Sequence, residues 1–89
     1  MTDGRHVVLA PAAQRQLRRL PPGVAARLRG PILSLALDPR PPGASQLVDT
    51  ELWRLRVGDL RIVYLIETEA IVVLKVARRS ESTYRRVDR

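Results

Sequence analysis

The chain has 89 residues, and 16 Lys or Arg against 9 Asp or Glu give it a formal charge of +7. We expect a single small domain over residues 1–89, because an apolar content of 45% is too high for a disordered basic tail. Cysteine is absent and His6 is the only histidine, so disulfide frameworks, thiol nucleophiles and multi-histidine metal sites are excluded. We therefore expect no metal and no small-molecule cofactor. No apolar run approaches the ~20 residues of a membrane span, so we expect a cytoplasmic protein without a membrane partner.

The sign of the charge favours an anionic partner. A strongly basic small domain suits nucleic acid or an acidic protein segment, although a charge that serves only solubility gives the same composition. Of the 16 basic residues, 15 are arginine and one is Lys75. Arginine binds phosphate bidentately, but a GC-rich coding sequence also enriches arginine, so this bias alone does not establish a function.

The first half of the chain predicts one strand followed by two helices. Residues 5–9 are rich in β-branched side chains and predict a short strand. Apolar positions in residues 11–20 have helical spacing, with proline at the first helical position and two prolines after the last. A second helical pattern covers residues 24–35 and ends before Asp38-Pro39. Gly30-Pro31 interrupts this pattern and predicts a kink or two short helices.

The second half predicts strands. Residues 39–45 contain three prolines and one glycine and predict a loop. Residues 52–57 and 60–66 alternate in polarity, whereas residues 70–77 are almost continuously aliphatic and predict a central strand covered on both faces. A polar tail follows at 80–89. The order β-α-α-β-β-β predicts an α+β fold in which two helices pack on one face of a mainly antiparallel, four-stranded sheet.

A hairpin at Gly58-Asp59 brings three arginines together. Glycine at the first position of a two-residue loop suits the primed turns, and this loop sets the strand register. The apolar pairs expected from that register are Val57 with Leu60, Leu55 with Ile62, and Trp53 with Tyr64. On the opposite face Arg56 lies across from Arg61, with Arg54 two residues along. Like charges directly opposite each other destabilise an antiparallel pair by up to about 1 kcal/mol, so stability does not explain the cluster. The alternative to an anion-binding face is a solvated face whose arginine stems cover aliphatic side chains.

Other candidates follow the hairpin. If the even-numbered residues of the strand at 70–77 are in the core, Lys75 and Arg79 join the arginine face. Tyr84 is interpreted either as a residue packed over the sheet edge or as a base-stacking or proton-transfer group beside that face. Glu81 is an alternative general base.

Several segments occur in the order found in a known family. They are A-x-x-x-L-x-x-L-P in the first helix, D-P after the second, the Pro-rich loop, L-W-R-L-R-V-G-D-L-R-I-V-Y, an aliphatic strand, and R-R-S-E-S-T-Y-R. The most specific is R-x-R-V-G-D-x-R-x-x-Y at residues 54–64. Over essentially its whole length the chain resembles the RelE/ParE superfamily of toxins from type II toxin-antitoxin systems, and the RelE branch most closely.

Resemblance to the RelE branch implies a toxin that inhibits translation as a ribosome-dependent mRNA endonuclease. Cleavage would use the ribose 2′-OH of the message and no metal. Either Arg79 or Arg78 matches the arginine that follows the last strand. The expected catalytic residues are Arg61, Arg79 and Tyr84, and the expected RNA-binding residues are Arg54, Arg56, Lys75 and Arg78. Arginines stand where the best-known members have lysines, so charge stabilisation carries over but proton removal by lysine does not.

The resemblance also implies partners. These are a cognate acidic antitoxin in a hetero-oligomer, the ribosome and mRNA, and operator DNA reached only through the antitoxin. A partly disordered antitoxin segment is expected to fold against the helices and sheet and to displace or occlude the arginine face. Two alternative functions are a ParE-like inhibitor of DNA gyrase without nuclease activity and a catalytically inactive, antitoxin-binding corepressor.

Overall fold

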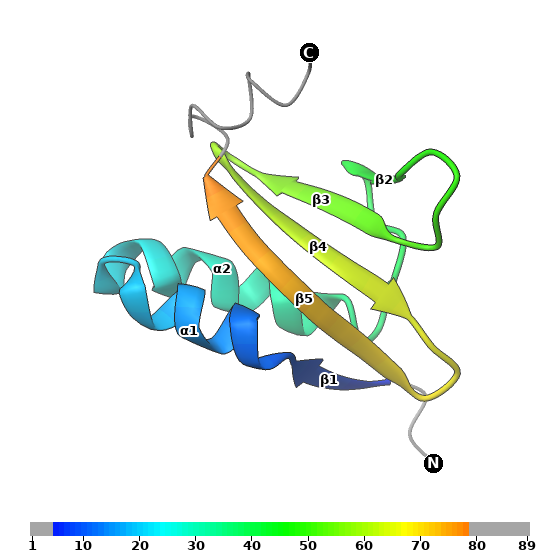
Figure 1. Ribbon diagram of the computed structural model, residues 1–89, viewed down its shortest axis with the longest axis horizontal. Helices are drawn as coiled ribbons and strands as arrows, with labels where there is room; N and C mark the ends of the chain where they lie inside the picture. Colours follow the sequence, from blue (N-terminus) through cyan, green and yellow to red (C-terminus); the bar gives the residue numbers. More distant parts are fainter. Residues whose placement is uncertain (1–4, 79–89) are drawn as a thin grey trace.

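The computed structural model describes residues 5–78. Its elements in chain order are β1 (His6–Leu9), α1 (Pro11–Arg19), α2 (Pro22–Ser34), β2 (Ala44–Gln46), β3 (Trp53–Val57), β4 (Leu60–Ile66) and β5 (Ala70–Arg78). The strands of this part of the chain form one sheet in the order β1-β5-β4-β3-β2, and both helices lie on one face of it (Figure 1). The predicted α+β class is therefore confirmed. Neither helix in the described range is long and apolar enough to span a bilayer.

The sheet is mixed and has one strand more than predicted. β1 runs parallel to β5, and the remaining neighbours pair antiparallel. The extra strand, β2, begins inside the segment predicted to be a loop. Three residues were too few to give a periodic pattern, and Gly43, with φ of 94°, turns the chain out of the Pro-rich segment so that Ala44 pairs with Leu55. An edge strand pairs on one side only, so this short piece without proline is sufficient.

The β3–β4 hairpin has the predicted register. Val57 pairs with Leu60 and Arg56 with Arg61, and the pairing continues to Trp53 and Tyr64. Gly58 has φ of 62°, as the first residue of a primed turn requires. The two-residue loop therefore decides which side chains of both strands point toward the helices.

α1 packs along β5. It begins at Pro11 as predicted, and its inward side carries Ala13, which is fully buried, and Leu17. Gln16 also points inward, and its Oε1 accepts a hydrogen bond from the backbone N–H of Val76 at 2.7 Å. That bond satisfies a donor on the stretch of β5 that extends past its pairing with β1.

α2 is one helix, so of the two alternatives predicted at Gly30-Pro31, a kink or two short helices, the second is wrong. Pro31 lies inside the helix but only three residues before its last residue, Ser34. Buried Leu28 and Ile32 on either side of the proline hold both turns against the sheet. Packing therefore outweighs the roughly 3 kcal/mol that a proline costs inside a helix.

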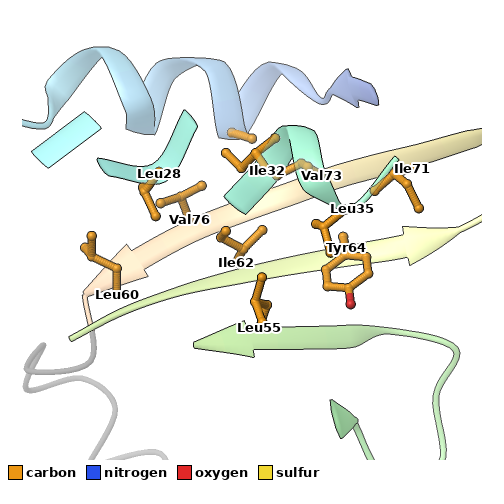
Figure 2. Close-up of a cluster of buried hydrophobic side chains, with 11 residues drawn as sticks. Leu28, Ile32, Leu35, Leu55, Leu60, Ile62, Tyr64, Ile71, Val73 and Val76 are labelled. Atoms are coloured by element: carbon orange, nitrogen blue, oxygen red, sulfur yellow. The ribbon is translucent and has the colours of Figure 1, made fainter. Parts of the chain in front are cut away.

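The core lies between the helices and one face of the sheet, as Figure 2 shows. Its fully buried large side chains are Leu28, Leu35, Leu60, Ile62, Tyr64, Ile71 and Val73. Within residues 5–78 the prediction that the strand at 70–77 is covered on both faces is wrong, because both helices pack on the same side. On the other side Val72 and Leu74 stay half-buried.

Tyr64 anchors the α2–β2 loop to the core. Its hydroxyl donates a hydrogen bond to the Pro39 carbonyl oxygen at 2.6 Å. The guanidinium of Arg40 lies 5.2 Å from the centroid of the Trp53 ring, which is a cation–π contact. Burial raises the pKa of Tyr64 to about 12, and the nearby Asp38 adds to this rise while Arg40 opposes it. These contacts place the loop that leads into β2.

Candidate nucleic-acid interface

The sheet face turned away from the helices gathers four basic side chains. Arg54, Arg56, Arg61 and Lys75 come from β3, β4 and β5, and we call them the arginine face. Arg56 pairs directly with Arg61, and Val63 lies between Arg54 and Lys75 in the next row. Their sequence neighbours Leu55, Ile62 and Val76 are buried on the helix side, so alternation along the strands directs all four basic residues outward.

Lys75 reaches this face through an irregularity in β5. Val63 pairs with Lys75 but the next residue, Tyr64, pairs with Val73, so Leu74 is an extra residue in the strand. The buried positions change from odd numbers at Ile71 and Val73 to an even number at Val76. The expectation of an even-numbered core therefore holds only beyond the bulge, which is where Lys75 lies.

The described strands contribute only basic charges to this face. In the described part of the chain no strand or helix contains an acidic residue; every Asp and Glu lies in a turn or loop. Arg56 and Lys75 are exposed and make no hydrogen bond or ion pair with another described residue. Arg54 is half-buried, and its Nη2 donates to Ser45 Oγ at 3.4 Å. Its Nε is buried and has no partner among residues 5–78.

The structure separates Arg78 from the arginine face. Arg78 pairs with Leu60, which is fully buried on the helix side, so the strand register directs both toward that side. Its Nε is buried and has no hydrogen-bond partner within the described range. Arg79, Glu81 and Tyr84 lie outside the described residues.

Sequence reasoning missed Ser45. It lies on β2, directly opposite Arg54 in the strand pairing, and its hydroxyl accepts the hydrogen bond from that guanidinium. A three-residue edge strand that follows three prolines and one glycine carries no periodic signal, so only the fold reveals the contact. Among residues 5–78 no three His, Cys, Asp or Glu side chains come together to hold a metal ion.

A second feature lies on the helical side. A groove of about 370 Å³ between β1, α1 and α2 is lined by Val7, Leu9, Leu17, Ala25, Arg29, Ile32 and Leu33. All of these except Arg29 are apolar, and Leu33 is 57% exposed. The groove and the arginine face are therefore on opposite sides of the sheet.

The chain matches a known protein family over most of its length. The model of the ParE toxins of type II toxin-antitoxin systems (parDE) matches residues 7–83. The chain belongs to the ParE toxin family. The predicted membership of the RelE/ParE superfamily is thus confirmed, and this protein is a toxin of a type II toxin-antitoxin system. No curated protein matches the chain in sequence.

Solved structures share the fold of this toxin. The RelBE2 toxin-antitoxin complex from Mycobacterium tuberculosis aligns with a TM-score of 0.78 and 24% identity, over 86% of this chain and 100% of that one. The archaeal RelE-RelB complex from Pyrococcus horikoshii aligns with a TM-score of 0.76 and 24% identity, over 90% and 100%. A mutant of the E. coli toxin RelE in the free state gives 0.75 and 16%, over 94% and 93%.

Proposed function

We propose that this toxin is a ribosome-dependent mRNA endonuclease that inhibits translation. The observation that carries the proposal is the arginine face. Its four basic side chains lie on adjacent strands and include the directly opposed Arg56 and Arg61. The strands of residues 5–78 contain no acidic residue. The opposed arginine pair weakens the hairpin, so an anionic ligand that contacts both side chains explains it better than stability does.

The proposed reaction uses the message's own ribose. The 2′-oxygen attacks the adjacent phosphorus, the bond from phosphorus to the 5′-oxygen breaks, and a 2′,3′-cyclic phosphate and a 5′-hydroxyl result. Arg61 and Arg79 stabilise the charge that develops on the phosphate oxygens. Tyr84 stacks on a base or transfers the proton from the 2′-hydroxyl to the leaving oxygen. Because Arg78 is paired with Leu60 on the helix side, Arg79 is the better-supported candidate for the arginine after β5.

Binding of the message is a separate role of the same face. Arg54, Arg56 and Lys75 hold the phosphate backbone in position, and Ser45 restrains the Arg54 side chain through its hydroxyl. Backbone contacts of this kind carry no sequence information, so the codon at which cleavage occurs is set by the ribosome-bound message rather than by this face.

Primer extension on a message in a purified translation system tests the proposal, with and without ribosomes. Wild-type toxin is expected to cut only when ribosomes are present, and Arg61→Ala is expected to abolish the cuts. Tyr84→Phe is expected to abolish them where the hydroxyl transfers the proton, and to leave them where the ring only stacks on a base. Arg27→Ala, an exposed helix arginine, is the matched control and should cut like the wild type. An intact message together with blocked gyrase supercoiling would instead assign a gyrase inhibitor, and inactivity in both assays would assign an inactive corepressor.

We also propose that an acidic antitoxin is the protein partner. Several of the similar solved structures are toxin-antitoxin complexes, among them those from M. tuberculosis and P. horikoshii. On this chain the apolar groove suits the aliphatic side of an antitoxin segment, and Arg29 at the groove suits its carboxylates. Leu33→Asp is expected to weaken antitoxin binding at least tenfold in calorimetry while message cleavage persists. Leu37→Asp is the control, because Leu37 is 79% exposed and lies outside the groove lining.

A further inference from the structure

The outward side of α1 is a second basic surface. Ala13, Gln16 and Leu17 face the sheet or the core, whereas Arg15, Arg18 and Arg19 are exposed. We call these three residues the α1 arginine surface. They make no hydrogen bond or ion pair with any other residue in the described part of the chain.

Stability of the helix accounts for only part of this surface. Arg18 and Arg19 lie in the last turn, where the helix dipole favours positive charge. Arg15 lies outside the last turn and has a like charge four residues later at Arg19, which is unfavourable on a helix. No acidic residue occurs anywhere between Asp3 and Asp38 to offset this repulsion.

The α1 arginine surface and the arginine face cannot bind the same single-stranded stretch of RNA. The helices cover one face of the sheet, with the apolar core between them and the sheet (Figures 1 and 2). The strand pairing puts the arginine face on the other side of the sheet. A single-stranded message held on Arg54, Arg56 and Arg61 therefore does not contact the outward side of α1. An anion bound by the α1 arginine surface therefore comes from a molecule other than this strand of message.

The chemistry of this surface distinguishes RNA from protein. The exposed positions on the outward side of α1 are Pro11 and four polar residues: Gln14, Arg15, Arg18 and Arg19. Protein partners need buried apolar or aromatic anchors, which the groove on this side of the molecule supplies and this surface does not. Phosphate contacts need only positive charge and hydrogen-bond donors.

We propose that the α1 arginine surface binds the phosphate backbone of folded ribosomal RNA, so that the toxin has RNA on both sides, message on the arginine face and ribosomal RNA on α1. This proposal rests on the proposed ribosome-dependent function. Docking through α1 would hold the arginine face toward the message. The two surfaces therefore divide the work between placing the toxin and engaging the scissile strand.

Binding to purified 70S ribosomes that carry no message tests this proposal, measured across a range of salt concentrations. The triple variant Arg15→Gln/Arg18→Gln/Arg19→Gln is expected to bind about tenfold or more weakly, with a salt slope reduced by about two to three. The triple variant Arg15→Lys/Arg18→Lys/Arg19→Lys keeps the three charges and should retain most of the affinity and slope. Circular dichroism establishes that all three proteins are folded.

The outcomes separate this proposal from the proposed nuclease function. Loss of affinity in the glutamine variant alone supports the α1 surface, even if the wild type fails to cut message. Wild-type affinity and slope in the glutamine variant would overturn the proposal and assign α1 to an acidic protein segment. Equal losses in both variants would overturn it too, because charge would not be the cause, and so would a wild type that does not bind the ribosomes.

Discussion

The two faces of β4 differ although they share one backbone. Ile62 and Tyr64 are fully buried toward the helices, while Arg61 and Val63, each one residue away, lie on the helix-free face. The inner side chains make the core, and the outer ones bring like charges together. Core packing and surface charge thus fall on alternate residues of the same strand, so mutations should change one without the other.

The largest expected effect comes from truncating an inner residue. Ile62→Ala is expected to lower the free energy of unfolding by about 2–5 kcal/mol, because a fully buried side chain leaves a cavity. The adjacent Val63 is half-buried on the outer face, so Val63→Ala should lower the free energy of unfolding by less than about 1.5 kcal/mol. Urea unfolding measures both. Equal losses at the two positions would remove the distinction between the faces.

Alkaline pH should weaken the inner face through Tyr64. Its pKa is raised to about 12 from the ordinary 10, so the folded chain keeps a proton that the unfolded chain loses. Stability is therefore expected to fall as pH rises from 10 to 12, by roughly 2–3 kcal/mol in total. Unfolding free energies measured at several pH values should show this loss in the wild type.

The Tyr64→Phe variant is the control for that measurement. It lacks the titrating hydroxyl and the 2.6 Å hydrogen bond to Pro39, so it should be less stable near neutral pH by about 1 kcal/mol. Because the variant does not lose stability through this group, its deficit relative to the wild type should shrink and then reverse between pH 10 and 12. A parallel fall in both proteins would show that another group titrates.

The turn that aligns the two faces should be sensitive to a methyl group. Gly58→Ala is expected to lower the free energy of unfolding by about 1–2 kcal/mol. The new Cβ would meet no neighbouring atom, so the loss comes from the backbone, whose φ of 62° is unfavourable for alanine. Gly23→Ala in the first turn of α2 also meets no atom and should be neutral or stabilising by up to about 1 kcal/mol. Thermal unfolding compares them, and a loss at both glycines would point to crowding instead of backbone strain.

The smallest expected effect has the opposite sign for stability and for binding. Arg56→Thr removes the charge opposite Arg61, so the free energy of unfolding should rise by a few tenths of a kcal/mol. RNA binding should weaken and its salt slope should fall by about one phosphate contact. A variant that loses stability and keeps its RNA affinity would favour a solvated structural face over an anion-binding one.

Local turn chemistry made the hairpin predictable. Gly58-Asp59 set the pairing of β3 with β4 residue by residue, and with it the convergence of Arg54, Arg56 and Arg61. The placement of Lys75 needed the bulge at Leu74, and no residue pattern predicts that bulge because the strand is aliphatic on both sides of Lys75. Assignments to Arg79 and Tyr84 stay predictions.

Longer-range effects decided what the sequence could not predict. β2 exists because β3 offers an open edge, and its three residues show no pattern of their own. α2 continues through Pro31 because Leu28 and Ile32 are both buried against the sheet. The groove beside Arg29 needs β1, α1 and α2 in place together, so no single segment reveals it.

The parallel pairing of β1 with β5 sets the order in which the toxin can be completed. His6–Leu9 has no strand to pair with until Ala70–Val73 has been synthesised, so the first strand made is among the last to be placed. Contacts so distant in sequence close slowly. A nascent chain therefore holds no finished sheet until residues 70–73 have been translated, so β1 stays without its neighbouring strand while the helices and the β3–β4 hairpin are already made.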